Sequence, residues 1–257
     1  MKLISSRDNA WYKALKQLAG SAAARRKAGR TLLDGSHLCQ VYLAQYGQPL
    51  HCVVNQDNQH HPEIATLMQA CEAQTIVIPD AMYQAVSPVE NGLGVLFVID
   101  TPQPTSLPSL QQNAVLLDQV QDPGNLGSIL RSAAAAGIRQ VFCSPGTAAA
   151  WSPKVLRSGM GAHFLLQIYE SVDLAELLRH SSIALLATSS YANQTLYDID
   201  LKQQVAWLFG HEGQGVSPEL LAQARWQIRI PHLGNMESLN VAACAAVCFF
   251  EQLRQNR

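Results

Sequence analysis

Two stretches near the end of the chain decide the fold, VAWLFGHEGQG over residues 205–215 and IRIPHLGNMESLNVA over residues 228–242. Each begins as a short apolar run, which predicts a strand, and continues into a loop of glycine and small polar residues. Glycine lets backbone N–H and C=O groups approach a ligand closely. The second loop leads into an apolar helix predicted over residues 239–253. Because loops at the carboxyl ends of strands bind small molecules in open α/β sheets, both loops are candidate ligand loops.

The rest of the chain alternates predicted strands with predicted helices of about ten residues. In the second half the strands are expected at 114–117, 140–143, 165–169 and 183–187, and the helices at 127–136, 153–160 and 174–180. In the first half the strands are expected at 31–33, 50–54, 75–78 and 94–99, and the helices at 9–18, 35–45 and 62–73. This alternation predicts largely parallel sheets covered by helices on both faces, and hence an α/β protein.

A domain boundary is predicted in the middle of the chain, where TPQPTSLPSLQQ over residues 101–112 holds three prolines and no charge. Such a sequence favours an extended linker. We therefore expect an N-terminal domain over residues 1–100, a linker over 101–112 and a C-terminal domain over 113–257.

Composition narrows the class of protein. Apolar residues make up 48% of the chain and charged residues 14%, which is typical of a globular protein with a sizeable core. No apolar run is long enough for a membrane span, and the N-terminus lacks the apolar core of a signal peptide, so a cytoplasmic location is expected. The six cysteines form no C-x-x-C pair, and His60 and His61 have no partner at ligand spacing, so no metal site is predicted.

The first 30 residues are strongly basic, with eight Lys and Arg against Asp8 alone, although the net charge of the whole chain is −1. A basic segment on an otherwise acidic protein is a candidate nucleic-acid contact, and a solvated helix face is the alternative. The candidate RNA-binding residues in this segment are Arg7, Lys13, Lys16, Arg25, Arg26, Lys27 and Arg30.

A third segment, residues 118–131, has the pattern of a strand end, a turn and a helix start. Asn125 is expected to cap this helix by accepting from backbone N–H groups. Arg131 falls about two turns into the helix among alanines, where a bound anion such as a phosphate would explain a cation. Neither G-x-G-x-x-G nor G-K-[ST] occurs here, so the segment does not match the common nucleotide-binding loops.

These segments resemble the signatures of one family, the SpoU (TrmH-like) RNA 2′-O-ribose methyltransferases of the SPOUT superfamily. Its first signature is similar to DPGNLG at 122–127 with Arg131, its second to FGHEGQG at 209–215, and its third to IP at 230–231 with ESLNV at 237–241. A further family segment is similar to SPK at 152–154 and the residues up to Gly161. The resemblance covers residues 113–257, and Ala242 departs from it because the third signature commonly has Ser there.

The first half resembles the family more loosely. ISS at residues 4–6 and LDG at 33–35 are similar to the N-terminal substrate-binding domain of rRNA-modifying members, whose fold is similar to a small RNA-binding ribosomal protein. Asp34 stands where Glu is usual in that domain. The resemblance thus implies a small α/β RNA-binding domain ahead of the catalytic domain.

For the C-terminal domain the resemblance implies a trefoil knot, in which the chain around residues 205–242 threads a loop. It also implies a homodimer with active sites at the interface, and S-adenosylmethionine as the methyl donor. The implied cofactor-binding residues are Thr188, Leu208, Phe209, Gly210, Glu212, Ile230, Pro231, Met236, Ser238 and Leu239.

The resemblance further implies a catalytic set. Arg131 is implied to bind the phosphate beside the target ribose and to serve as base, but a guanidinium keeps its proton in proteins, so phosphate binding and orientation are the expected role. Glu212 is expected to orient Arg131 or a substrate hydroxyl, and the alternative is a contact with the N-terminus of a helix beginning near Ser217. The implied set is Asn125, Arg131, Glu212, Ser238 and Asn240.

The expected function is S-adenosylmethionine-dependent methylation of a ribose 2′-hydroxyl in rRNA. A tRNA methyltransferase of the same fold is one alternative. A catalytically silent RNA-binding protein is another, and Ala242 is the feature in its favour.

Overall fold

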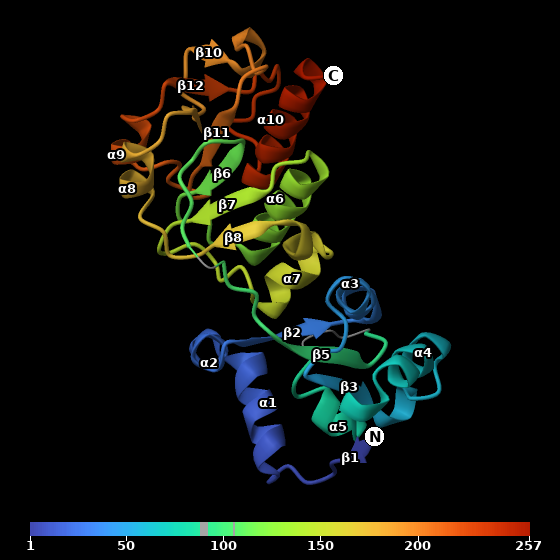
Figure 1. The fold of residues 1–257 in the computed structure, drawn as a ribbon. Helices are drawn as coiled ribbons and strands as arrows, with labels where there is room; N and C mark the ends of the chain where they lie inside the picture. Colours follow the sequence, from blue (N-terminus) through green and yellow to red (C-terminus); the bar gives the residue numbers. More distant parts are fainter. Residues whose placement is uncertain (88–91, 105) are drawn as a thin grey trace. The chain divides into compact units, whose positions relative to one another are not determined.

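The chain forms two units in a computed structural model that describes residues 1–87, 92–104 and 106–257 (Figure 1). Unit 1 comprises Met1–Pro102 and Trp151–Phe164, and unit 2 comprises Gln103–Ala150 and Leu165–Arg257. Trp151–Phe164 thus groups with unit 1, whereas the sequence-based limits put it in the C-terminal domain. Residues 88–91 of the expected N-terminal domain and Thr105 of the expected linker lie outside the described residues.

Unit 2 contains a seven-stranded sheet in which every pairing between neighbouring strands is parallel, in the order β10-β12-β9-β11-β6-β7-β8. This confirms the predicted mostly parallel sheet. Its elements are β6 (Ala114–Leu117), α6 (Pro123–Ala135), β7 (Gln140–Cys143), β8 (Gln167–Tyr169), α8 (Leu174–Arg179), β9 (Ala184–Thr188), β10 (Gln194–Thr195), 3-10 helix η4 (Leu196–Asp198), β11 (Val205–Phe209), α9 (Pro218–Leu221), β12 (Trp226–Arg229) and α10 (Val241–Gln255).

Helices cover both faces of this sheet. Alternate side chains of a strand point to opposite faces, and those of β11 are buried on both. On one face, Trp207 and Phe209 of β11 pack against Phe249 of α10, which itself lies beside α6 (Figure 1). The Trp207 indole N–H donates to Gln252 Oε1 at 2.8 Å, which pairs a buried polar group. On the other face, Ala206 and Leu208 join a core with the apolar residues of α8 and α9.

The order of the strands brings four loops together. β12, β9, β11 and β6 are consecutive neighbours, and because they are parallel their carboxyl ends lie at one edge of the sheet. Both ligand loops of the sequence analysis leave from this edge, after β11 and β12. The predicted helix at 127–136 starts earlier, at Pro123, so that α6 begins at the same edge. The trefoil knot implied by the family resemblance stays a prediction.

Unit 1 contains a five-stranded mixed sheet, in the order β1-β4-β3-β5-β2. The prediction of a largely parallel sheet is wrong here, because β5 returns between β3 and β2 and is antiparallel to both. The alternation of helices and strands does not specify strand direction. The elements are β1 (Lys2–Leu3), α1 (Ala10–Gly20), α2 (Ala22–Ala28), β2 (Arg30–Asp34), α3 (Ser36–Tyr46), β3 (His51–Asn55), η1 (Gln56–Asn58), α4 (Pro62–Ala70), η2 (Glu72–Gln74), β4 (Thr75–Ile78), α5 (Asp80–Tyr83), β5 (Val95–Asp100) and α7 (Pro153–Gly159), with η3 (Ala162–Leu165) at the boundary.

The basic segment is helical over most of its length. Asn9 caps α1 by accepting from the N–H groups of Trp11 and Tyr12, and Tyr12 is the buried aromatic residue of α1. Gly29 ends α2 in the left-handed region, at φ 62°. In the described part of the chain no helix is both long and apolar enough to cross a membrane.

Candidate active site

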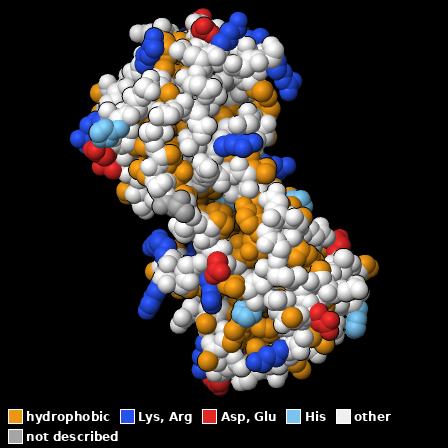
Figure 2. Space-filling view, viewed as in Figure 1, with side chains coloured by type: hydrophobic (Ala, Val, Ile, Leu, Met, Phe, Trp, Pro, Cys, Tyr) orange, Lys and Arg blue, Asp and Glu red, His pale blue; other side chains and the backbone are white. Residues whose placement is uncertain are grey.

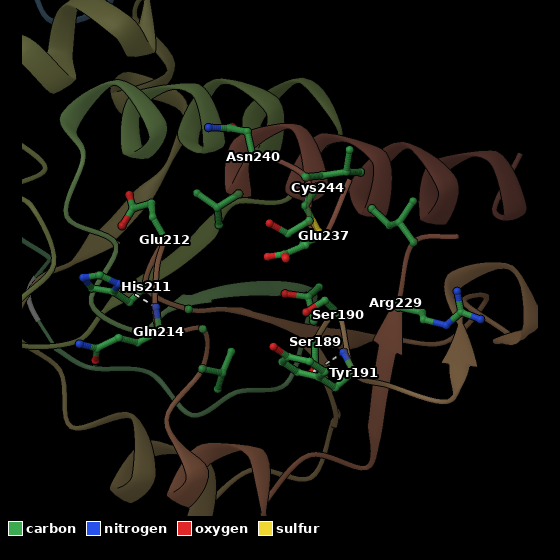
Figure 3. A pocket seen from close by; sticks show the side chains of 18 of the residues that line it. Ser189, Ser190, Tyr191, His211, Glu212, Gln214, Arg229, Glu237, Asn240 and Cys244 are labelled. Atoms are coloured by element: carbon green, nitrogen blue, oxygen red, sulfur yellow. Dashed lines mark hydrogen bonds between the residues drawn. The ribbon is translucent and has the colours of Figure 1, made fainter. Parts of the chain in front are cut away.

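A cavity of about 890 Å³ opens at the carboxyl edge of the unit 2 sheet, between the loops that follow β9, β11 and β12 (Figure 3). Figure 3 shows Glu212 and His211 on one side, Ser189, Ser190 and Tyr191 on another, and Cys244 of α10 facing the space between them. Its walls are formed by Thr188, Ser189, Ser190, Tyr191, Gly210, His211, Glu212, Gly213, Gln214, Gly215, Val216, Leu221, Ile228, Arg229, Ile230, His232, Glu237, Ser238, Leu239, Asn240, Val241 and Cys244.

The loop after β11 is a tight turn that closes on its first residue. A Cβ atom at Gly210 would lie 2.1 Å from the carbonyl carbon of Gly215, so only glycine fits at this position. His211 and Gly215 exchange two backbone hydrogen bonds of 3.0 and 2.8 Å. His211 Nδ1 also accepts from the N–H groups of Gly213 and Gln214. These contacts hold the loop in one conformation and turn it toward the cavity.

Helix α6 follows β6, the strand beside β11, and its N-cap differs from the one that the sequence predicted. Asp122 is the N-cap, since its Oδ1 accepts from Asn125 N at 2.8 Å, and Pro123 occupies the first turn. The prediction of Asn125 as the cap is therefore wrong: Asn125 lies inside the first turn. This leaves the Asn125 side chain available for contacts across the site.

The Asn125 side chain joins the two ligand loops. Its Nδ2 donates to Glu212 Oε1 at 3.1 Å, and its Oδ1 accepts from Asn240 Nδ2 at 2.9 Å. Because a carboxylate can only accept, the amide N must face Glu212, which fixes the orientation of Asn125. Three of the five predicted catalytic residues thus form one hydrogen-bonded chain, which we call the Glu212–Asn125–Asn240 network.

Glu212 also binds the backbone at the start of α6. Its carboxylate accepts from Gln121 N at 3.2 Å and from Asp122 N at 3.0 Å. Burial alone would raise its pKa, but the hydrogen bonds from Asn125 and these N–H groups outweigh burial and hold the pKa of Glu212 below its usual value. Glu212 is therefore a carboxylate at neutral pH. It contacts the N-terminal end of α6, and its predicted role in orienting Arg131 or a substrate hydroxyl stays a prediction.

Asn240 connects the network to α10. Its Oδ1 accepts from the N–H groups of Ala242 and Ala243, which makes it the N-cap of this helix. One turn later Cys244 lines the cavity. A hydrogen bond with the Cys248 thiol, aided by Thr188, lowers the pKa of Cys244, and burial raises the pKa of Cys248. Cys248 is buried, whereas Cys244 is only half-buried.

The remaining two predicted catalytic residues lie apart from the network. Ser238 is exposed and lines the cavity. Arg131 is exposed on α6 and is not among the cavity-lining residues, and within the described residues it forms no ion pair with a carboxylate. A guanidinium without a protein partner is free to bind an anion.

The predicted cofactor-binding residues divide into two groups. The first group lines the cavity and comprises Thr188, Gly210, Glu212, Ile230, Ser238 and Leu239. The second group does not line it and comprises Leu208, Phe209, Pro231 and Met236. Leu208 and Phe209 have fully buried side chains in β11, so only their backbone lies near this edge. The sequence analysis missed Tyr191, Arg229 and Cys244, because no local pattern distinguishes them from ordinary loop and helix residues.

The predicted RNA-binding residues of unit 1 lie on α1 and α2 or directly beside them in the sequence. Arg7, Lys16, Arg26 and Lys27 are exposed, and Figure 2 shows Lys and Arg side chains projecting near α2. Lys13 pairs with Asp8 and Arg30 with Asp100 at the surface. Arg25 differs from the others, because its guanidinium donates to the carbonyl oxygens of Leu18 and Ala19 at the end of α1.

Comparisons with known proteins identify the family of the chain. The model of the SpoU rRNA Methylase family matches residues 112–250. An uncharacterized tRNA/rRNA methyltransferase of Synechocystis sp. is 34% identical, over 98% of this chain and 93% of that protein. The 23S rRNA (guanosine(2553)-2′-O)-methyltransferase RlmP of Bacillus subtilis is 29% identical, over 97% of this chain and 98% of that protein.

A solved structure described as an RNA 2′-O ribose methyltransferase superposes with a TM-score of 0.83 at 27% identity, and the match covers 98% of each chain. The similarity therefore extends over both units. The chain belongs to the SpoU rRNA methylase family.

Proposed function

We propose that this protein transfers a methyl group from S-adenosylmethionine to a ribose 2′-hydroxyl of rRNA. The observation that carries the proposal is the Glu212–Asn125–Asn240 network. It links the cavity-lining loops directly to α6, the helix that carries Arg131. A small-molecule site and an anion-binding helix are thus held in fixed geometry.

The cavity suits the methyl donor. Its volume of about 890 Å³ lies in the range of small-molecule sites. Residues of the loop at 210–216 line it, Glu237 points into it and Arg229 lies at its edge, while the carboxylate of Glu212 is bound to the start of α6 (Figure 3). This balance favours a ligand with positive charge. When bound there, S-adenosylmethionine supplies an electrophilic methyl group on a positively charged sulfur.

The RNA side of the site would be held by Arg131. Its planar guanidinium can donate two parallel hydrogen bonds to one phosphate, which fixes the adjacent ribose as well as attracting it. Methyl transfer is an in-line displacement, so the main task of the protein is to align the 2′-oxygen. Because the pKa of Glu212 is lowered, its carboxylate is a weak base, and we assign it the positioning of Asn125.

The substrate assignment rests on unit 1 and on the relatives. The exposed cations of α1 and α2 suit a polyanion. The Bacillus subtilis relative, which matches both units, is named as a 23S rRNA enzyme. Action on rRNA would place the protein in the cytoplasm with its substrate.

We also propose a homodimer formed through unit 2. Leu233, Met236 and Leu239 are exposed apolar residues in the loop before α10, and Phe250 is exposed on α10 itself. Exposed apolar side chains of this kind favour burial against another protein surface.

The test is to incubate the purified protein with total RNA and methyl-tritiated S-adenosylmethionine, and then to map the labelled nucleotide. The expected result is label on a ribose 2′-oxygen of rRNA. Label in tRNA would assign the other substrate class. Cofactor binding without any incorporation would instead support an RNA-binding protein without catalytic activity.

A further inference from the structure

Asp118, which the function so far leaves unassigned, is a buried carboxylate at the carboxyl edge of the unit 2 sheet. It directly follows β6 and is only 5% exposed. Within the described residues no Lys, Arg or His pairs with it. Burial of an unpaired carboxylate is costly unless hydrogen bonds satisfy it, so the hydrogen bonds of Asp118 deserve a functional explanation.

Asp118 contacts both ends of the loop that lines the cavity after β11. Its backbone N–H donates to the carbonyl oxygen of Phe209 at 2.8 Å, just before the loop. Its Oδ2 accepts from the N–H of Ser217 at 2.9 Å, just after the loop. The loop between these two contacts closes on Gly210 and supplies Glu212 to the network. One residue therefore fixes where the loop leaves the sheet and where it returns.

The second carboxylate oxygen of Asp118, Oδ1, is connected through Ser144 to the turn that leads to α6. Ser144 Oγ donates to Asp118 Oδ1 at 3.4 Å and accepts from Gln119 N at 3.0 Å. Gln119 has a φ of 58°, in the left-handed region that is unfavourable for residues other than glycine. These contacts stabilise the turn whose next residues, Gln121 and Asp122, donate to Glu212.

We propose that Asp118 is a positioning residue for methyl-donor binding, which it controls by holding both ends of the 210–217 loop. This inference rests on the proposed function. Asp118 is not among the cavity-lining residues, so its effect on the donor passes through the backbone of the loop. Loss of the contact to Ser217 releases the returning end of the loop, while Arg131 and the basic surface of unit 1 remain unchanged.

The first experiment compares Asp118→Ala and Asp118→Asn with the unchanged protein by calorimetric titration of S-adenosylmethionine and by steady-state kinetics. Asp118→Ala is expected to raise the Kd and KM for the donor by about tenfold or more, the effect of losing a hydrogen bond to a charged group. The KM for RNA should stay unchanged. Asp118→Asn keeps an oxygen that can accept from Ser217 N–H, so it should recover most of the affinity.

A second pair of variants tests the same contact if Asp118→Ala does not fold. Ser217 has a φ of −59°, which proline can adopt, so Ser217→Pro removes the donor N–H with little backbone change. Ser217→Ala keeps the N–H and is the matched control, because the Ser217 hydroxyl makes no capping hydrogen bond. Ser217→Pro should weaken donor binding as Asp118→Ala does, and Ser217→Ala should not.

Folded Asp118→Ala or Ser217→Pro protein with the donor affinity of the unchanged protein would overturn the inference. A lower melting temperature in either variant without a change in donor Kd would also overturn it, since that result indicates a purely structural carboxylate. If the unchanged protein itself binds no S-adenosylmethionine, the proposed function fails instead, and the two failures are thereby distinguished.

Discussion

At the scale of single residues, the predicted site contains three side chains that are hydrogen-bonded to one another and one cation, Arg131, that contacts none of them. Asn125, Glu212 and Asn240 are mutually hydrogen-bonded, whereas Arg131 extends from α6 without a partner among the described residues. This division indicates that the network shapes the site and that Arg131 contacts the substrate. Variants of the two kinds should therefore fail in different ways.

Arg131→Ala should abolish methyl transfer and leave S-adenosylmethionine affinity nearly unchanged, because Arg131 lies outside the cavity. Arg131→Lys keeps the charge but loses the two-pronged hydrogen bonding, so an intermediate rate is expected. Single-turnover methylation and calorimetry measure the two quantities. Loss of donor binding in Arg131→Ala would contradict the assignment.

Glu212→Gln should lower the melting temperature at neutral pH. The pKa of Glu212 is lowered in the folded protein, so its stabilising contribution is present above the ordinary carboxyl pKa and is lost as pH falls through the lowered value. The difference in melting temperature between the variant and the unchanged protein should thus shrink on acidification. A difference that grows toward acid pH would show that the pKa is raised.

At the scale of elements, α10 depends on a cap that also belongs to the site. Asn240→Asp keeps the oxygen that accepts from Ala242 and Ala243 but replaces the group that donates to Asn125. We expect it to keep the stability and lose methylation. Asn240→Ala should lose both, with a stability cost of about 1 kcal/mol. Denaturant unfolding measures the stability of each variant, and the methylation assay measures its activity. Equal stability of the two variants would refute the capping role.

The basic surface of unit 1 also contains two kinds of cation. Lys27→Ala should weaken RNA binding and reduce its salt dependence, because Lys27 is exposed and available to a phosphate. Arg25→Ala removes the guanidinium from the last carbonyls of α1, and it should cost about 1 kcal/mol of stability. Filter binding over a salt series and thermal melting measure these effects. A loss of RNA affinity without destabilisation in Arg25→Ala would show that Arg25 binds RNA directly.

Short elements with clear boundaries were predictable from the sequence, and long-range geometry was not. β4, β6 and β7 have the predicted limits, because each is an apolar run between helix and turn residues. The helix α2 is absent from the helices expected from the sequence, although Ala, Arg and Lys all favour helices and Gly29 is a typical residue to end one. The direction of β5 depends on pairing with distant strands.

The same limit applies to the site. The signatures predicted which residues matter, yet the hydrogen bonds of Asn125 join residues 87 and 115 positions away along the chain. No local pattern specifies such a contact. The error over the cap of α6 has a local cause, since Asp122 and Asn125 can both cap and Pro123 favours the helix start after Asp122.

At the scale of the whole molecule, the proposed dimer can be tested at α10. Phe250→Glu places a charge on an exposed apolar position of α10 and should convert the dimer to a monomer. Light scattering after size-exclusion chromatography measures the mass. Gln223→Glu, at an exposed position after α9, is a matched control that should stay dimeric. A monomeric unchanged protein would remove the dimer from the account.

The central claim, ribose methylation of rRNA through Arg131 and the adjacent cavity, is tested most directly in cells. The measurement is nucleotide-resolution mapping of 2′-O-methylation in rRNA from cells with and without this gene. The account predicts that one rRNA ribose loses its methyl group in the deletion strain, that the unchanged gene restores it, and that Arg131→Ala does not. An rRNA methylation profile that is identical with and without the gene would contradict the claim.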